Sequence, residues 1–283
     1  MPGPGLQILQ RQGTRIAFRV DGKGPPLVMI QGVGAQGTSA NPQIAVLQNY
    51  FTCLTFDSSG IGQSVPFNGE LTVKGMAADT AALMDHLGWD SAHIIGHSLG
   101  GLVALQFALD ARPRVRSLTL LCSFARGSDV TKPTASLLWI LLRIRAGTRR
   151  MRRRAFMELV LSERERIGDE DQILRKLSGV LGHDVADIPE ITTRQVIAMK
   201  NHDVTDRLRE LAGIPTLVMN GTEDPIAPPK AGRAIAAGIP GARYIEFSGT
   251  SHALPIFRAE ECARKTLAHL QDAEVLRRKG QRS

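Results

Sequence analysis

The feature that most constrains the fold of this chain is the run GHSLG at residues 96–100, followed directly by Gly101. A run typical of a β-strand precedes it at 92–95 (AHII), and a run typical of an α-helix follows it at 102–109 (LVALQFAL). A Gly-x-Ser-x-Gly pattern between a strand and a helix indicates a turn so tight that its flanking positions tolerate almost no side chain. Because such a turn pushes the serine hydroxyl out of the sheet, Ser98 is predicted to be a catalytic nucleophile.

Length and composition are those of a globular protein. The chain has 283 residues, of which 43% are hydrophobic and 22% are charged, a balance that excludes a disordered chain. At this length α/β folds often form one domain with an insertion. No stretch reaches the about 18 apolar residues that cross a bilayer. The first residues also lack a charged leader followed by an apolar core. We therefore expect neither a transmembrane segment nor a secretory signal.

Cysteine usage points to a reducing compartment. Cys53, Cys122 and Cys262 lie far apart in the sequence, and none belongs to a pair with metal-ligand spacing. We expect three reduced, buried thiols, which predicts a cytoplasmic protein with no disulfide framework and no bound metal.

The net charge of +8 is concentrated in one segment. Seven arginines, the first Arg143 and the last Arg154, share a stretch that contains no acid, and a smaller basic group lies at 277–279. No nucleic-acid-binding motif accompanies them, so nucleic acid is not expected as a partner. We interpret the arginine segment as a solvated face. The alternative is docking of an anionic carrier or a membrane surface.

Strand-type runs alternate with helix-type runs through most of the chain. Residues 7–20 predict an antiparallel hairpin that ends at the turn signal of 21–24 (DGKG). Buried strands are predicted at 27–30, 51–56, 92–95, 117–122, 214–220 and 243–247, and helices at 73–87, 102–109, 230–237 and 259–270. This alternation indicates a mostly parallel central sheet flanked by helices on both faces, hence an α/β fold.

The alternation breaks after Phe124, where helix-like stretches without a convincing strand occupy about 126–210. The predicted organisation is an α/β core of residues 1–125 and 211–283 with a helical cap, or lid, of residues 126–210. Within it, 135–142 (ASLLWILL) is apolar nearly all round. We interpret it as a lid helix packed on both sides, part of whose surface, with Trp139, lines a substrate pocket.

A serine nucleophile needs two partners. A base must accept its proton during attack, and histidine suits this role because its unperturbed pKa lies near about 6.5. An acid must then fix the tautomer of the histidine. The chain supplies them in the order Ser98, Asp224, His252. Asp224 and His252 each follow a predicted strand closely, so all three are predicted at the carboxyl edge of one sheet.

Other residues compete for these roles. His97 is better explained as packing beneath the nucleophile than as the base. Glu223 is the neighbouring rival of Asp224. Asp57 also ends a predicted strand, but the glycines after it indicate that it organises a turn. The remaining histidines on helical or lid segments lack this context: His86, His183, His202 and His269.

Four motifs of the chain occur together in one known superfamily. They are GHSLGG at 96–101, D-x-x-G-x-G-x-S at 57–64, G-x-x-D at 221–224, and the late His252. In them the chain resembles the α/β-hydrolase superfamily over about residues 15–270. It is similar to the small cytoplasmic esterases, enol-lactonases and cofactor-free haloperoxidases. The resemblance implies the α/β-hydrolase fold and an oxyanion hole made by the backbone N–H groups of Leu99 and Val33.

Two positions depart from the pattern of that superfamily. It usually has His-Gly where this chain has Gln31 and Gly32, and commonly Asp-x-Arg-Gly where this chain has DSSG at 57–60. Both changes alter the polar groups around the pocket, which Gln31 and Gly32 are predicted to line. The serine nucleophile argues against the dehalogenase and epoxide-hydrolase branches, which need a carboxylate in its place.

The sequence therefore predicts a serine hydrolase without a cofactor, monomeric or homodimeric, that cleaves a carboxylic ester or lactone with an apolar acyl part through an acyl-enzyme on Ser98. Two alternatives remain open. The same triad could support perhydrolase (haloperoxidase-like) or acyltransferase activity, or the fold could serve as a ligand-binding receptor on a hydrolase scaffold.

Overall fold

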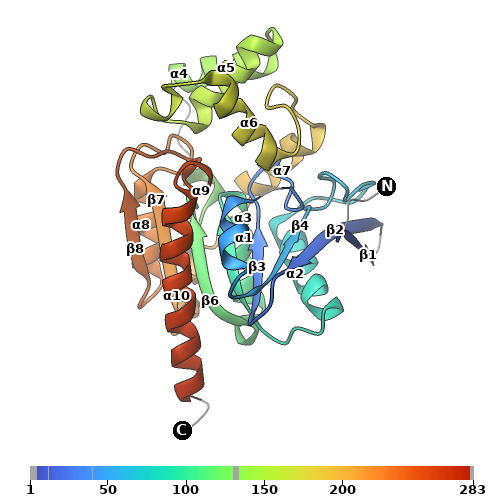
Figure 1. Cartoon of the computed structure of the whole chain (residues 1–283), viewed down its shortest axis with the longest axis vertical. Helices are drawn as coiled ribbons and strands as arrows, with labels where there is room; N and C mark the ends of the chain where they lie inside the picture. Colours follow the sequence, from blue (N-terminus) through green and yellow to red (C-terminus); the bar gives the residue numbers. More distant parts are fainter. Residues whose placement is uncertain (1–4, 12, 40, 130–133, 281–283) are drawn as a thin grey trace.

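The computed structural model describes residues 5–11, 13–39, 41–129 and 134–280 (Figure 1). Within them, one eight-stranded sheet has the order β1-β2-β4-β3-β5-β6-β7-β8. β1 and β2 join the sheet antiparallel and the other strands run parallel, as predicted. The strands are β1 (Gln7–Arg11), β2 (Thr14–Asp21), β3 (Pro26–Ile30), β4 (Thr52–Phe56), β5 (Ala92–His97), β6 (Val115–Leu121), β7 (Thr216–Gly221) and β8 (Arg243–Phe247).

The central strands are apolar on both faces because helices cover both. Alternate residues point to opposite faces of a strand, so Val28 and Ile94 pack into one core while Met29 and Ile95 pack into the other. Helices α2 (Val73–His86), α3 (Leu99–Asp110) and α8 (Pro229–Gly238) cover the first face, and α1 (Pro42–Leu47) and α10 (Ala259–Gly280) cover the second. This layering confirms the predicted α/β class.

Two short helices were not predicted. α1 has only six residues, although Asn41 caps it by accepting hydrogen bonds from the N–H groups of Gln43 and Ile44. α9 (Leu254–Phe257) has four. Neither helix is long enough for the sequence to show apolar residues repeating at helical spacing. One predicted helix was too short: α10 continues ten residues beyond its predicted end at 270.

Between β6 and β7, the residues that the structure describes form helices and no strand. These are α4 (Ala135–Arg145), α5 (Arg149–Val160), α6 (Glu170–Leu181) and α7 (Glu190–Lys200), here called the helical insertion. Figure 1 shows it stacked over the carboxyl edge of the sheet. Side-chain caps start three of the helices, at Thr134, Thr148 and Asp169. The domain boundaries at 125/126 and 210/211 stay a prediction.

The expected packing of α4 on both sides is wrong. Its inner residues Ile140 and Ile144 are half-buried and buried, but its outer residues Leu138, Trp139 and Leu142 are all more than half exposed. The insertion is one helical layer at this point, so nothing among the described residues covers the outer side. Separately, none of the described helices has both the length and the hydropathy that crossing a membrane requires.

Candidate active site

Ser98 stands between the last residue of β5 and the first residue of α3, with φ 55° and ψ −121°. A residue with a side chain rarely adopts this backbone conformation. The glycines around it allow the turn. A Cβ at Gly96 would collide with the carbonyl of Gly100, and one at Gly100 would collide with the carbonyl of Ile30. Glycine is therefore required at 96 and 100, because the backbones of the strand, the turn and the helix are in direct contact there.

The structure brings the three predicted triad residues into one chain of hydrogen bonds. Ser98 Oγ lies 2.9 Å from His252 Nε2, and His252 Nδ1 lies 2.8 Å from Asp224 Oδ2. A carboxylate only accepts hydrogen bonds, so Nδ1 carries the proton and Nε2 is free to accept one from the serine hydroxyl. All three side chains are buried or nearly so.

Asp224 is held by its second oxygen. Oδ1 accepts hydrogen bonds from the N–H groups of Ile226 and Ala227, both at 2.8 Å. This fixes the carboxylate in the turn after β7 and leaves Oδ2 for His252. The rival Glu223 is exposed. The geometry thus pairs His252 with Asp224, the residue that the family resemblance favoured over Glu223.

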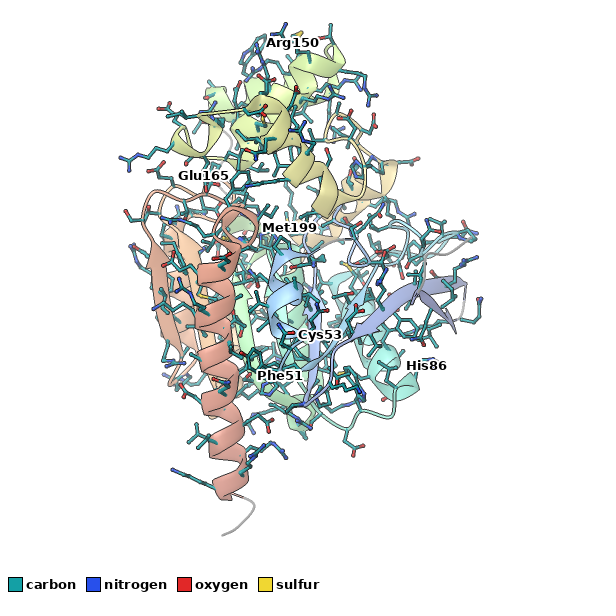
Figure 2. All side chains as sticks on the ribbon, viewed as in Figure 1. Phe51, Cys53, His86, Arg150, Glu165 and Met199 are labelled. Atoms are coloured by element: carbon teal, nitrogen blue, oxygen red, sulfur yellow. The ribbon has the colours of Figure 1, made fainter. Side chains whose placement is uncertain are left out.

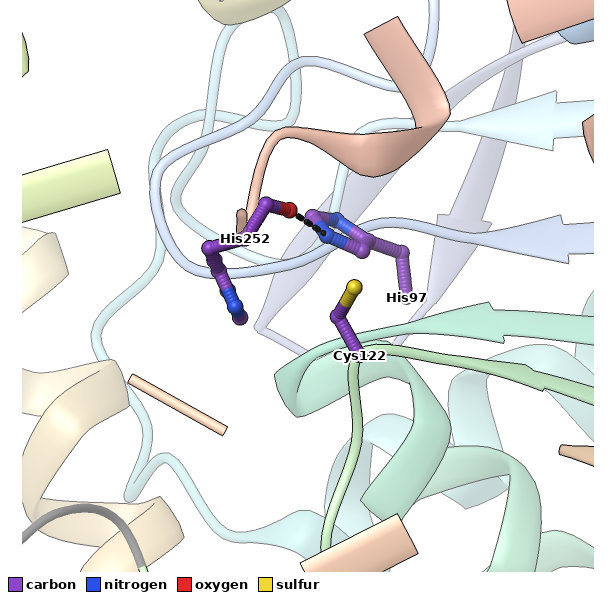
Figure 3. Close-up of side chains that lie close together, drawn as sticks. All are labelled: His97, Cys122 and His252. Atoms are coloured by element: carbon purple, nitrogen blue, oxygen red, sulfur yellow. Dashed lines mark hydrogen bonds between the residues drawn. The ribbon is translucent and has the colours of Figure 1, made fainter. Parts of the chain in front are cut away.

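His97 packs beneath the pair, as predicted, and it also holds His252. Its ring centroid lies 5.0 Å from that of His252, and its Nε2 donates to the His252 carbonyl oxygen at 3.1 Å (Figure 3). Burial, with a smaller effect from His252, lowers the pKa of His97 to about 3. It is therefore neutral at ordinary pH and acts as a hydrogen-bond donor at a fixed position.

Cys122 completes a cluster with the two histidines, and their ligating atoms lie within 4.8 Å of one another (Figure 3). A metal ion would need the thiolate and a free nitrogen of His252. Burial and the nearby Asp224 raise the pKa of the Cys122 thiol well above its usual range, and both nitrogens of His252 are engaged. The cluster fits packing beneath the triad better than it fits a metal site.

The backbone N–H groups of Leu99 and Val33 have no acceptor within the part of the chain that the structure describes. They are the pair that the family resemblance implied for an oxyanion hole. Leu99 follows the serine directly. The loop of Val33 lies against the same turn, because a Cβ at Gly32 would lie only 3.1 Å from Ser98 Cβ.

Two residues fix this loop: Gln195, which lies outside any recognised motif, and Asp57, the first residue of the motif at 57–64. Gln195 of α7, itself buried, accepts a hydrogen bond from the N–H of Gly34 at 2.8 Å. Asp57 accepts hydrogen bonds from both the N–H and the hydroxyl of Thr38, and from the N–H of Gln63. Asp57 thus organises loops, as predicted. Gln195 was missed because nothing in the sequence distinguishes a helix residue that faces a distant loop.

A cavity of about 520 Å³ opens at Ser98 and His252, between the sheet edge and the helical insertion. Gln31 and Gly32, the predicted pocket residues, line it, and so does Val33. Its walls are mostly apolar, and residues of the insertion supply many of them, among them Leu137, Leu141, Phe156, Leu159, Leu177 and Met199.

Trp139, predicted as a pocket residue, does not line this cavity and is 56% exposed. Each helical residue is turned about 100° from the last. Leu137 and Leu141, four residues apart, therefore share the inner side of α4, and Trp139 between them points outward. The sequence identified the helix correctly but not its rotation about its axis.

Comparison of the chain with known protein families and structures agrees with this fold. Residues 25–259 match the family described as alpha/beta hydrolase fold. The chain belongs to the α/β-hydrolase family, which confirms the resemblance inferred from its motifs.

Individual relatives are distant. The chain is 31% identical over 268 residues to an uncharacterised protein of Mycobacterium tuberculosis (strain ATCC 25618 / H37Rv), covering 88% of this chain and 76% of the relative. It is 29% identical over 255 residues to the pyrrolizixenacetamide deacetylase of Xenorhabdus hominickii, covering 88% and 91%. Among solved structures, the enol-lactonase from Burkholderia xenovorans LB400 superposes with a TM-score of 0.79 at 24% identity, covering 94% of this chain and 100% of that one. That likeness concerns the fold.

Proposed function

We propose that this α/β hydrolase cleaves a carboxylic ester or lactone with an apolar acyl part through an acyl-enzyme on Ser98. The observation that carries the proposal is the unbroken hydrogen-bond chain from Ser98 through His252 to Asp224, at the base of an apolar cavity. The Xenorhabdus relative, named as a deacetylase, supports acyl cleavage.

In the first half-reaction, Ser98 Oγ attacks the carbonyl carbon and its proton passes to His252 Nε2. The imidazolium that forms is stabilised by Asp224, whose position the two backbone N–H bonds hold. The negative charge on the carbonyl oxygen is taken up by the N–H groups of Leu99 and Val33. His252 then gives its proton to the leaving alkoxide, and the acyl group stays on Ser98.

In the second half-reaction, water attacks the acyl-enzyme. His252 accepts a proton from the water and returns it to Ser98 Oγ as the acid leaves. His97 serves both steps as a positioning residue, because its hydrogen bond to the His252 carbonyl fixes the backbone from which the imidazole extends.

The cavity indicates the kind of acyl group. Its apolar walls favour an aliphatic or aromatic acyl part, since burial of apolar surface is what such a pocket offers. The helical insertion supplies much of that wall and acts as a lid in this proposal. Gln31 lines the cavity and its amide makes no hydrogen bond to any residue that the structure describes. It is available to a polar group of the substrate.

The test is turnover of nitrophenyl esters of graded acyl length by the wild type and by Ser98→Ala. We expect activity that rises with acyl length and that falls by roughly 10⁴-fold or more in the variant. A variant with normal turnover would refute the proposal. Product analysis with added peroxide or alcohol separates hydrolysis from perhydrolysis and acyl transfer. Stoichiometric fluorophosphonate labelling without repeated turnover would instead favour the receptor alternative.

We also propose a cytoplasmic location. The three cysteines are free and buried, which supports a reducing compartment. The oligomeric state, monomer or homodimer, stays a prediction that sedimentation velocity would decide.

A further inference from the structure

The helical insertion presents an apolar surface to solvent. Leu138, Trp139 and Leu142 are 55%, 56% and 53% exposed. Their spacing along α4 places them on one side of the helix, and Arg145, three residues after Leu142, extends the same stripe. We call these four residues the α4 outer face. Singly exposed apolar residues are ordinary, but a contiguous group on one helix of a soluble domain marks an interaction surface.

The inner side of the same helix belongs to the cavity. Leu137 and Leu141 line the space that opens at Ser98. α4 therefore separates solvent from the candidate site by the thickness of one helix. Whatever binds the α4 outer face lies next to the wall of the pocket.

The arginines of this segment divide into two groups. Four form ion pairs with acids of the insertion: Arg143 with Glu158, Arg149 with Asp184 and Asp187, Arg153 with Asp184, and Arg154 with Glu170. The other three, Arg145, Arg150 and Arg152, have no carboxylate within ion-pair distance in the described ranges. Arg150 lies at the end of the insertion that is farthest from the sheet (Figure 2). Met199, which lines the cavity, lies between Arg150 and the sheet.

We infer that the α4 outer face docks on an anionic lipid surface, with the leucines and Trp139 in the boundary between headgroups and acyl chains and the exposed Arg145 and Arg150 on lipid phosphates. An apolar helix face flanked by arginines fits this boundary. On the proposed function, this docking deepens the substrate assignment: the ester or lactone is one that partitions into membranes and enters the cavity past α4.

Two other occupants fit less well. A second copy docked by the same face would bring like charges together, because a two-fold contact pairs a surface with itself. A strongly acidic protein would need more unpaired cations and fewer exposed leucines than this face offers. Lipid satisfies both the apolar and the cationic parts.

Tryptophan fluorescence can report docking of the α4 outer face. It has two tryptophans, Trp139 and Trp89, and Trp89 is half-buried just before β5, at the opposite edge of the sheet. In a Trp89→Phe background, we expect vesicles of phosphatidylglycerol and phosphatidylcholine in equal parts to shift Trp139 fluorescence to the blue. Pure phosphatidylcholine should give a smaller shift. Salt at about 1 M, where the Debye length is about 3 Å, should weaken binding to the anionic vesicles.

Co-sedimentation of the full chain with the same vesicles supplies the matched comparison. The double variant Leu138→Ser/Leu142→Ser should lower the partition coefficient by roughly tenfold. The control, Val275→Ser/Leu276→Ser, removes two equally exposed apolar residues from α10 at the far end of the molecule (Figure 1) and should leave partition unchanged. Arg150→Gln should lower binding to anionic vesicles only.

Absence of sedimentation with anionic vesicles overturns the inference, as does equal loss in the α4 and α10 variants. Salt-sensitive binding to polyglutamate in place of vesicles would indicate an acidic protein partner. Self-association that Leu138→Ser/Leu142→Ser abolishes would indicate a second copy. Either result overturns docking on lipid. Ser98→Ala should bind vesicles like the wild type, so docking is judged independently of turnover, and ester cleavage without vesicle binding leaves the proposed function standing alone.

Discussion

Gln195 reaches from the helical insertion to the loop that carries the candidate oxyanion donor Val33. Its side-chain oxygen accepts from the N–H of Gly34, the residue after Val33, and Gly34 itself has a positive φ of 73° that a glycine accommodates. The loop also holds Gly32 against Ser98 Cβ. The position of the Val33 loop therefore depends on Gln195 of α7, a residue more than 150 positions further along the chain.

We predict that Gln195→Leu lowers kcat by roughly tenfold with little change in KM. The loop is loosened rather than deleted, so the effect stays below the about 10²–10³-fold loss that follows removal of an oxyanion donor. Stabilisation that exists only in the transition state appears in kcat. Steady-state kinetics with a soluble nitrophenyl ester measures both constants.

The matched control is Gln106→Leu. Gln106 is an equally buried amide, but it binds Asp110 and His202 on α3 and the segment after α7. It should lower stability to a similar extent and leave kcat unchanged. If both variants lose kcat equally, the effect comes from general loosening and Gln195 has no positioning role.

The candidate catalytic residues were easier to locate from the sequence than the residues that position them. Ser98, Asp224 and His252 follow predicted strands of one parallel sheet, and parallel strands bring their carboxyl ends to a common edge. Gln195 and Trp139 lie on helices, where the direction of a side chain depends on how the helix is rotated against its neighbours. That rotation is set by tertiary packing, and the local sequence around Trp139, apolar on all sides, does not define it.

At the scale of elements, glycine has opposite effects in the turn at Ser98 and in α6. Gly96 lies where β5 meets α3, and a Cβ there would collide with the backbone of Gly100 and Gly101. Gly179 lies in α6, exposed, with nothing within 4 Å of where its Cβ would be. Gly96 is therefore required by the packing. At Gly179 glycine only adds the conformational entropy that the chain loses when it folds.

We predict that Gly179→Ala raises the free energy of unfolding by about 0.5–1 kcal/mol, the gain expected from alanine in an exposed helix interior. Gly96→Ala should lower it by more than about 3 kcal/mol, because backbone cannot move aside as a flexible side chain can. Urea unfolding followed by circular dichroism measures both. Destabilisation by Gly179→Ala would show that α6 is held in a conformation other than a regular helix.

The long helices α2 and α6 were predicted within a few residues, whereas the short helices α1 and α9 were not predicted and the end of α10 was placed ten residues too early. α2 and α6 have an apolar face that repeats over several turns, and their caps at Thr72 and Asp169 mark where they begin. α1 and α9 each make little more than one turn. Such helices are stabilised by tertiary contacts, as when Ile44 and Leu47 of α1 pack into the core beneath α10, and those contacts leave no local pattern.

At the scale of the whole molecule, two buried histidines fasten α10 to the sheet. His93 of β5 donates from Nε2 to Glu274 of α10 and accepts at Nδ1 from the hydroxyl of Ser117. His269 of α10 donates from Nε2 to the carbonyl of Leu118, and its Nδ1 accepts from Arg243. His269 needs a neutral imidazole, because Arg243 can only donate to its Nδ1. The contacts of His93 are those of a neutral ring that donates to Glu274 and accepts from Ser117.

Burial lowers the pKa of both histidines to about 4, although Glu274 opposes the shift at His93. The unfolded chain, with an ordinary histidine pKa near about 6.5, therefore binds protons that the folded chain does not. Stability from this source is complete above pH of about 6.5 and is lost as the pH falls toward about 4. Each histidine contributes a slope of about 1.4 kcal/mol per pH unit in that window.

We predict that the free energy of unfolding of the wild type falls steeply between pH of about 6.5 and 4.5, and that His93→Gln makes the slope shallower by about 1.4 kcal/mol per pH unit. Urea titrations at a series of pH values measure it. Ser117→Ala is the control: it removes a hydrogen bond from His93 but keeps the titrating ring, so it should lower stability and preserve the slope. His269→Gln should reproduce the effect of His93→Gln from the helix side. Parallel curves for the wild type and both glutamine variants would contradict the prediction, because acid would then loosen the molecule through groups other than those that join α10 to the sheet.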